Sequence, residues 1–262
     1  MGSDVNLNLV AAGLLWAAGK LDNNGAPLKG YTGERGLGWV SLIKGGTLHG
    51  WRASQVTDWS SFSWWDGKDI WPSKENMGTD SFNLVPGRAE HLLNMPKHDA
   101  PNPDIYSKTI QVEGPQSNLF YVGPIDGGDF KNFEFKVDVY THPGSTSGIY
   151  FHTRYKNDGR PVYGYEAQIN SSRRGESKTG SLVGVSEVNT TPHNDNEWFT
   201  YYIKVDGKKV TIKINDEIVN EFTEQDGAEG PDNLRRGTIA FESTGARKSR
   251  VEFRNPLIRL LQ

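Results

Sequence analysis

The chain has 262 residues, with 29 Lys and Arg against 32 Asp and Glu, which gives a formal net charge of -3. This balance leaves no broad positive field for nucleic-acid phosphates, so we exclude nucleic acid as a partner. With 35% hydrophobic residues, 30 glycines and 13 prolines, the composition is typical of a turn-rich globular protein whose length allows one large all-β domain.

The absence of cysteine removes disulfides, thiolate nucleophiles and cysteine-ligated zinc. The most apolar N-terminal stretch, residues 9–18, is too short to span a bilayer and lacks a preceding run of Lys or Arg. We therefore expect no membrane span. If Met1-Gly2-Ser3 is a cloning remnant, a native export signal could already be missing.

The first part of the chain predicts little regular structure. Residues 1–36 mix a weak apolar run with a loop rich in Gly, Asn and Pro, and predict an N-terminal arm. A single domain is expected over residues 37–262, opening with a short strand and a Gly-Gly turn between Gly38 and Trp51. Residues 52–118 show little periodicity and contain six prolines, which predicts a long irregular insertion with short helical or strand pieces.

From residue 119 the sequence alternates between apolar and polar residues, as strands with one buried face do. Phe133–Val139 is the clearest example. Further strands are expected at 148–155, 163–170, 181–188, 199–205, 210–214, 217–222, 238–242 and 250–253. Asp206-Gly207 and Asn215-Asp216 predict hairpin turns. Many short strands without helical periodicity predict an antiparallel β-sandwich of the jelly-roll type.

Three of these strands place hydrogen-bonding side chains on the face opposite their apolar residues. These side chains are Tyr150, His152 and Arg154, then Glu166, Gln168 and Asn170, and finally Glu242 and Thr244. Planar donors and acceptors beside an aromatic residue suit a sugar. The alternative is a set of ordinary exposed residues on strands that are not neighbours.

Tryptophan and the acids near residue 126 give weaker signals. Five of the 8 tryptophans, including Trp65, fall within residues 51–71, where they form either a sugar-binding wall or the core of the insertion. Asp126 and Asp129 flank two glycines, as in some calcium sites, although such a pattern is more often a turn.

Several motifs together resemble the 3-keto-disaccharide hydrolase domain family of bacteria. The motifs are Gly38-Trp39, Gly50-Trp51, Phe130-x-x-Phe133-Glu-Phe, Ser147-Gly-Ile-Tyr-Phe151, Gly164-Tyr-Glu-Ala-Gln168, Lys178-Thr-Gly-Ser181, Trp198, Gly237-Thr-Ile-Ala-Phe241 and Val251-Glu-Phe-Arg-Asn255. The resemblance implies a concanavalin-like jelly roll, a periplasmic or extracellular location, and cleavage of glycosides oxidised at C3. The sequence departs from the family at His152, where Arg is usual, at Asn170, where Asp is usual, and at Glu242 and Thr244, which replace a Gln-x-His pair.

The implied substrate suggests roles for the polar residues. A C3 ketone acidifies the hydrogen on C2, so a base can start elimination of the group on C1, followed by addition of water. We assign the base to Glu166, stabilisation of the enolate to Arg154 or a divalent metal such as calcium, and protonation of the leaving oxygen to His152 or Glu242. The residues expected to contact the sugar are Gln168, Asn170, Lys178, Tyr150 and Trp65.

Other functions stay open at this stage. Glu166 and Glu242 could act as the paired carboxylates of an ordinary glycosidase. The domain could instead be a carbohydrate-binding module without catalysis, or a structural or interaction domain of a surface-attached complex, because a jelly roll does not fix a function.

Overall fold

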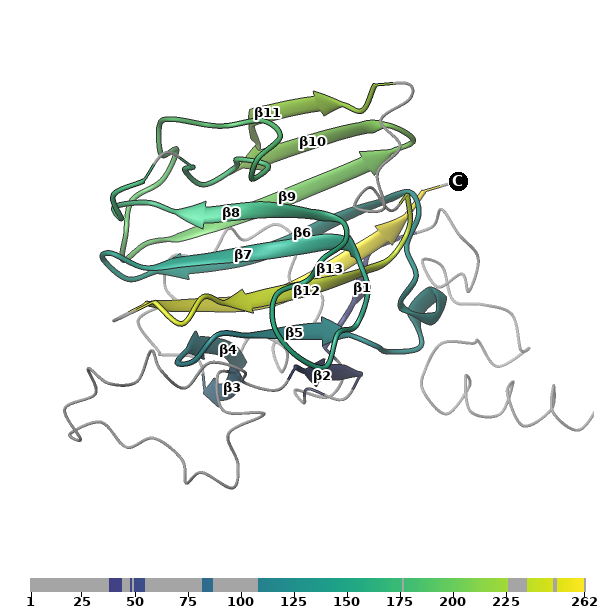
Figure 1. The fold of residues 1–262 in the computed structure, drawn as a ribbon, viewed down its shortest axis with the longest axis horizontal. Helices are drawn as coiled ribbons and strands as arrows, with labels where there is room; N and C mark the ends of the chain where they lie inside the picture. The colour runs from purple at the N-terminus through teal and green to yellow at the C-terminus, as the bar shows by residue number, and fades with distance from the viewer. Residues whose placement is uncertain are drawn as a thin grey trace, which may run out of the picture.

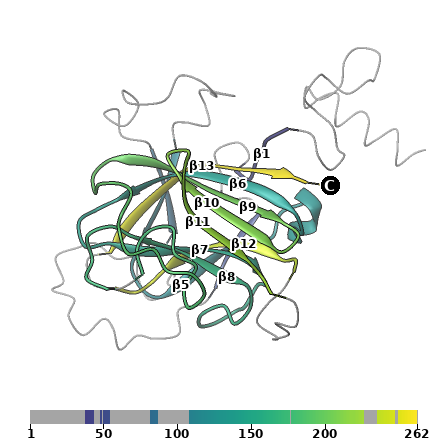
Figure 2. The same ribbon diagram turned by 90° about the horizontal axis from the view of Figure 1, so that it is seen from above.

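A computed structural model describes residues 38–43, 48, 50–54, 82–86, 108–175, 177–225, 235–246 and 249–261, with the backbone alone over 82–86 and at 108. Its strands form two antiparallel sheets that pack face to face (Figure 1). Figure 2 shows β6 and β13 in one layer and β5, β7 and β8 in the other. The expected all-β sandwich is therefore confirmed.

The larger sheet follows the strand order β11-β10-β9-β6-β13-β4-β3, and β1 pairs with β13. Its strands are β1 (Val40–Ser41), β3 (Phe82–Pro86), β4 (Lys108–Glu113), β6 (Phe133–Thr141), β9 (Trp198–Asp206), β10 (Lys209–Ile214), β11 (Glu217–Thr223) and β13 (Arg250–Leu260).

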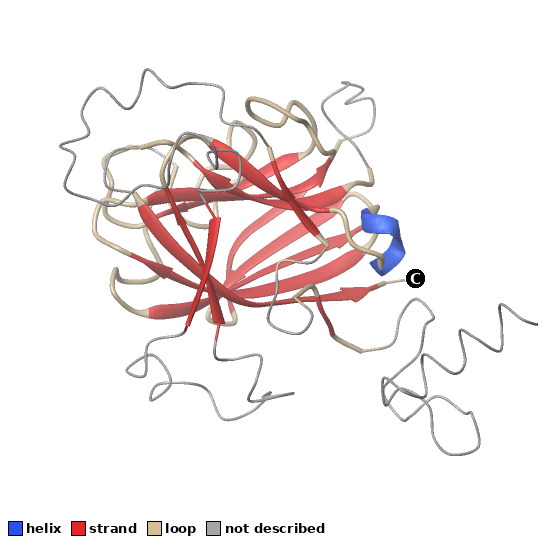
Figure 3. Ribbon diagram, turned by 90° about the horizontal axis from the view of Figure 1, so that it is seen from below, coloured by secondary structure: helices blue, strands red, loops and turns tan. Residues whose placement is uncertain are grey.

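The smaller sheet follows the order β2-β5-β12-β7-β8. Its strands are β2 (Trp51–Ala53), β5 (Ser117–Tyr121), β7 (Thr146–Thr153), β8 (Tyr165–Asn170) and β12 (Thr238–Ser243). Within the described residues the helical structure is one 3-10 turn, Ile125–Gly128, between β5 and β6 (Figure 3). No helix in this part of the chain is long and apolar enough to cross a membrane.

The core lies between the sheets because alternate residues of each strand point inward. In β6, Phe133, Phe135 and Val137 are almost completely buried. Phe241 of β12 stacks on Phe253 of β13 with ring centroids 4.2 Å apart, which joins the two sheets at their centre. The residues of the smaller sheet that alternate with these inward positions point away from the larger sheet, on what we call the outer face.

The hairpin signals of the sequence match the turns of the larger sheet. The β9–β10 turn contains Gly207 with φ 62°, and the β10–β11 turn contains Asn215 and Asp216 with φ 51° and 69°. Asn, Asp and Gly tolerate this left-handed conformation best, so the turn residues fix the register of both hairpins.

The strand expected over residues 181–188 is wrong. This segment turns back on itself, with isolated bridges from Leu182 to Ala167 and to Ser186. Gly180 and Gly184 adopt φ values of 96° and 72°, which interrupt an extended strand. The segment runs along the edge of β8 instead, since Val183 N–H donates to the Glu166 carbonyl.

The expected insertion contributes strands to both sheets. Residues 82–86 and 108–113 pair with each other as β3 and β4, and β4 pairs with β13, so these two strands form one edge of the larger sheet. Residues 117 and 118 begin β5, which pairs with β12. Trp51 is core, stacked on Phe241, whereas Trp65 and the expected arm over 1–36 lie outside the described residues.

Candidate functional site

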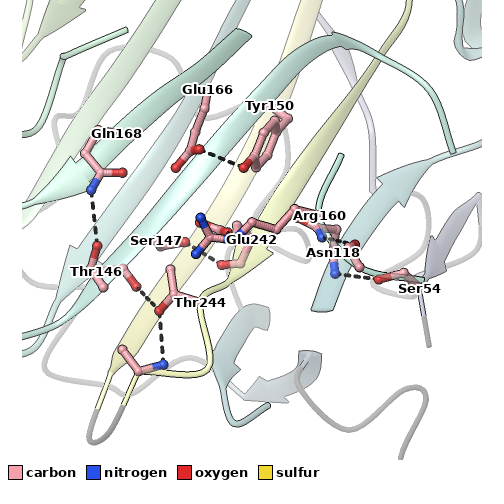
Figure 4. Close-up of polar contacts among 12 residues, drawn as sticks. Ser54, Asn118, Thr146, Ser147, Tyr150, Arg160, Glu166, Gln168, Glu242 and Thr244 are labelled. Atoms are coloured by element: carbon pink, nitrogen blue, oxygen red, sulfur yellow. Dashed lines mark hydrogen bonds and ion pairs between the residues drawn. The ribbon is translucent and has the colours of Figure 1, made fainter. Parts of the chain in front are cut away.

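Polar side chains form a strip on the outer face of the smaller sheet (Figure 4). The pairing register places Glu242 opposite Asn118 on β5, and Tyr150 opposite Glu166 on β8. Because the four strands β5, β12, β7 and β8 are consecutive neighbours, these side chains share one surface. The sequence prediction that Tyr150, Glu166 and Glu242 lie together is therefore met by the structure.

Glu166 is held in place by two neighbours on β7. The Tyr150 hydroxyl donates to Glu166 Oε2 at 2.7 Å. Gly148 leaves the space that the Glu166 side chain crosses, because a Cβ at residue 148 would lie 2.9 Å from Glu166 Oε1 and 3.0 Å from its Cγ. Thus a tyrosine fixes the far oxygen while a glycine lets the carboxyl lean towards β12.

Glu242 is the most enclosed acid of the strip, with 1% of its surface exposed. Burial, together with the charge of Glu166, raises the pKa of Glu242 to about 8. Arg160 opposes this rise, with its Nε 3.6 Å from Glu242 Oε1. At neutral pH Glu242 is therefore mostly protonated and can donate a proton.

Glu166 is the member of the pair whose neighbours favour the charged form more strongly. Burial raises its pKa as well, but the hydrogen bond from Tyr150 and the charge of Arg160 work against that rise. The two carboxyls also share a hydrogen bond and titrate together. Two neighbouring acids whose surroundings separate their protonation states can serve as base and acid of one reaction.

Hydrogen-bonding groups continue the strip on both sides of the pair. The Gln168 amide lies 3.3 Å from Thr146 Oγ1, and with the amide turned over its nitrogen donates to Glu166 Oε1 at 3.2 Å. Thr244 Oγ1 donates to the Thr146 carbonyl at 3.3 Å. These short polar groups can orient the hydroxyls of a ligand.

His152 does not belong to this strip, contrary to the sequence prediction. The backbone bulges at His152, which has φ 54°, and the register between β7 and β12 shifts there. The imidazole is buried, bonds the Lys131 carbonyl through Nε2 at 2.9 Å and packs edge-on against Phe133. The bulge rotates the side chain away from the outer face, so His152 is a packing residue and no acid for the leaving group.

Arg154 is also displaced from its expected place. It follows the end of β7 and is exposed. The cation beside the carboxyl pair is Arg160, from the connection between β7 and β8. Periodicity along a strand could not predict this residue, because Arg160 reaches the sheet from a loop.

Asn170 and Lys178 hold a loop together at the far end of β8. Asn170 Nδ2 donates to the Ser177 carbonyl at 2.9 Å. Lys178 Nζ donates to the carbonyl of Arg173 at 2.7 Å. The structure thus brings these two residues to the same loop, and not to the carboxyl pair.

The described residues hold no group of three or more His, Cys, Asp or Glu that could bind a metal ion. In the suggested calcium loop, Asp129 forms an ion pair with Arg236 at 2.7 Å. Asp126 carries φ 47° within the turn, as a tight turn requires. The turn interpretation of this segment fits the structure better than the calcium site.

Asn118 is a site residue that the sequence analysis missed. Its side chain is completely buried on the outer face beside Glu242, and its Nδ2 donates to the Gly159 carbonyl at 3.3 Å. It lay within the expected insertion, so no strand pattern was assigned to it. The alternation of Asn118 and Phe120 with the core residues Leu119 and Tyr121 is the signal that could have identified it.

The outer face of this two-sheet sandwich thus carries a carboxyl pair and short polar side chains, which suit the binding of a carbohydrate. Residues 38–259 match the family of 3-keto-alpha-glucoside-1,2-lyase-like domains, which covers most of the chain. The chain belongs to this family, and the resemblance stated from its motifs is confirmed. Membership connects the chain to carbohydrate chemistry. No curated protein matches it.

Several solved structures are similar in shape at low sequence identity. A Parabacteroides distasonis ATCC 8503 chain proposed to be a glycosyl hydrolase is 20% identical, with TM-score 0.49 over 59% of this chain and 81% of that one. A Bacillus subtilis protein of unknown function with a galectin-like fold is 12% identical, with TM-score 0.49 over 88% and 98%. The carbohydrate-binding module CBM66 of Bacillus subtilis is 13% identical, with TM-score 0.41 over 58% and 86%.

Proposed function

We propose that the protein cleaves 3-keto-α-glucosides by elimination across C1 and C2 of the sugar. The observation that carries this proposal is the pair Glu166 and Glu242, which lie together on the outer face, Glu242 enclosed and Glu166 bonded by the Tyr150 hydroxyl. Family membership supplies the substrate class. The pair supplies the base and the acid that this reaction requires.

Glu166 acts as the base. A ketone at C3 makes the C2 hydrogen acidic, and removal of this proton breaks the C2–H bond and leaves an enolate. The Tyr150 hydroxyl donates to Glu166 Oε2, which favours the charged form and fixes the carboxyl, and Oε1 takes the proton in this mechanism. Such positioning is the main contribution that a fixed base makes to the rate.

Glu242 acts as the acid for the leaving oxygen. As the enolate collapses, C1=C2 forms and the C1–O bond breaks, and the Glu242 proton passes to the departing oxygen. The hydrogen bond between the two carboxyls then lets the proton taken by Glu166 move to Glu242, which restores the starting state. This return needs no second acid such as His152.

Arg160 stabilises the charge that develops on the C3 oxygen. Its side chain is 60% exposed, with Nε 3.6 Å from Glu242 Oε1, so a ligand on the outer face can reach it. A fixed cation aimed at a developing oxyanion is usually a large contribution to catalysis. Gln168 and Thr146 orient the neighbouring hydroxyls in this mechanism.

The test is to incubate the protein with methyl 3-keto-α-glucopyranoside and with its unoxidised parent, and to follow methanol release. We expect release from the keto substrate alone, and its loss in Glu166→Gln. Asp206→Asn, at an exposed position far along the chain, serves as the matched control. No release from the keto substrate contradicts the proposal, and binding without release favours a carbohydrate-binding module.

A further inference from the structure

The connection between β7 and β8 crosses the outer face and covers part of the strip. We call residues 155–160 of this connection the strap. Tyr155 begins the strap and lies edge-on against Phe120, with ring centroids 5.4 Å apart, and Arg160 ends it beside Glu242. The strap helps to explain why Glu242 is only 1% exposed on an outward-facing surface.

Under Tyr155 lies a small apolar cluster, separate from the main core, which we call the ledge. It consists of Phe120, Tyr150 and Ala240. These residues are cross-strand neighbours on β5, β7 and β12, and each is at most 6% exposed. An apolar ledge bordered by acids and amides is the kind of surface on which a pyranose ring packs.

The strap makes the contacts with this surface that a sugar would make. Its tyrosine ring covers the ledge, the Gly159 carbonyl accepts from Asn118, and Arg160 approaches Glu242. A sugar offers the same combination, because it has an apolar ring face and hydroxyls that both donate and accept.

Two acceptors beneath the strap are not satisfied by it. Asn118 Oδ1 and Glu242 Oε1 are both buried and have no hydrogen-bond donor. Leaving a buried polar atom without a partner is unfavourable, and native proteins do so rarely. A ligand with hydroxyl groups could donate to both atoms, whereas the strap presents a carbonyl to Asn118 and only a distant Nε to Glu242.

We propose that the strap is a lid over a hydroxyl-binding subsite formed by Asn118 and Glu242. A sugar replaces Tyr155 on the ledge and the Gly159 carbonyl at Asn118, while Arg160, at the end of the strap, stays beside Glu242. The identity of the ligand as a glycoside rests on the proposed function. The existence of a displaceable lid rests only on the strap contacts. Asn118 is then a specificity-determining residue, since its amide would contact the sugar once the Gly159 carbonyl has moved away.

Opening of the strap can be measured by limited proteolysis, because trypsin cuts after Lys156. Tyr155 contacts Phe120 and also holds the Arg52 guanidinium 4.1 Å above its ring. Tyr155→Ala removes both contacts, so we expect native-state trypsin cleavage in the strap to become about tenfold faster. Tyr163→Ala alters an exposed tyrosine of the same connection outside the strap and should leave the rate unchanged.

A second experiment tests whether a sugar displaces the strap. Methyl 3-keto-α-glucopyranoside is added to the Glu166→Gln protein, which should not consume it. Trypsin cleavage and amide hydrogen exchange over residues 155–160 are then followed against sugar concentration. We expect both rates to rise and to saturate. The hydrogen-exchange measurement uses a protein with an unaltered strap sequence, so it tests the proposal even if Tyr155→Ala fails to fold.

Equal strap cleavage in Tyr155→Ala and wild type would overturn the proposal. The proposal would also be overturned if the sugar left amide hydrogen exchange in the strap unchanged. Slower exchange would overturn it too, because the strap would then close over the bound sugar. Displacement of the strap without methanol release from wild type would contradict the proposed reaction alone. Methanol release with an undisturbed strap would contradict the lid alone.

Discussion

Glu166 and Glu242 show how position within one sheet separates two identical side chains. Both are on the outer face, yet Glu242 is enclosed and Glu166 accepts a hydrogen bond from Tyr150. The sequence predicted that these acids share a face because strands have a period of two. It could not predict which acid is protonated, since that depends on burial and on Arg160 from a loop.

We expect the enclosed acid to make folding depend on pH. The pKa of Glu242 rises from 4.5 to about 8 in the folded protein, so between these values the folded chain binds a proton that the unfolded chain has lost. Stability should therefore fall as pH rises through this window, by at most about 1.4 kcal/mol per pH unit from this group. In Glu242→Gln that part of the slope disappears. Urea unfolding between pH 5 and pH 8 measures the difference, and identical slopes would contradict the assignment.

For His152, the face predicted from strand alternation is wrong because one backbone dihedral angle is unusual. The alternation of β7 places it on the polar face, but its φ of 54° turns it against Phe133. No residue type in the motif marks this bulge, so the sequence could not show it.

His152→Asn should separate packing from catalysis. Asparagine tolerates positive φ but loses the packing of the ring against Phe133. We expect a melting temperature several degrees lower and kcat near that of wild type at a temperature where both proteins are folded. A large loss of kcat in a fully folded variant would restore His152 as a catalytic residue.

At the scale of elements, the site depends on four adjacent strands and on one glycine within β7. Gly148 of β7 sits opposite Gln168 and provides the room for the Glu166 side chain. Neither the pairing order nor this close approach can be derived from periodicity, which gives the face of a strand but not its neighbours. The loop that carries Arg160 escaped prediction for the same reason.

Gly148→Ala should displace the Glu166 carboxyl while leaving residue 166 itself unchanged. The added Cβ would lie 2.9 Å from Glu166 Oε1, so the carboxyl must shift, and kcat/KM should fall on the order of 100-fold. The control is the same change in a Glu166→Ala background, where the stability cost should shrink by about 1 kcal/mol because the clash is gone. Additive stability changes would show that the two residues do not interact.

At the scale of the whole molecule, the apolar alternation predicted a sandwich, and the structure has one. The β6 pattern and the two hairpin turns were sufficient for this, since each follows from local chemistry. The segment 181–188 was misassigned because glycines with positive φ interrupt it, although its apolar residues alternate. The strands β3 and β4 were expected only as unplaced pieces of the insertion, because six prolines interrupt residues 52–118 and the segment shows little periodicity.

The contact between the sheets should dominate stability. Phe253 is fully buried and stacks on Phe241 across the sandwich. We expect Phe253→Ala to lower the free energy of unfolding by about 3–5 kcal/mol. Ile218→Ala changes a side chain on β11 that is 57% exposed and should cost little. Equal losses of unfolding free energy for the two variants in urea titrations would contradict a dominant role for this contact.

The division of labour between Glu166 and Glu242 is the central claim, and exchange of the sugar C2 hydrogen in D2O tests it most directly. Followed by NMR on methyl 3-keto-α-glucopyranoside, Glu242→Gln should still exchange the C2 hydrogen for deuterium while its methanol release falls sharply. Glu166→Gln should lose both. Exchange that survives in Glu166→Gln, or that disappears only in Glu242→Gln, would contradict the assignment of base and acid.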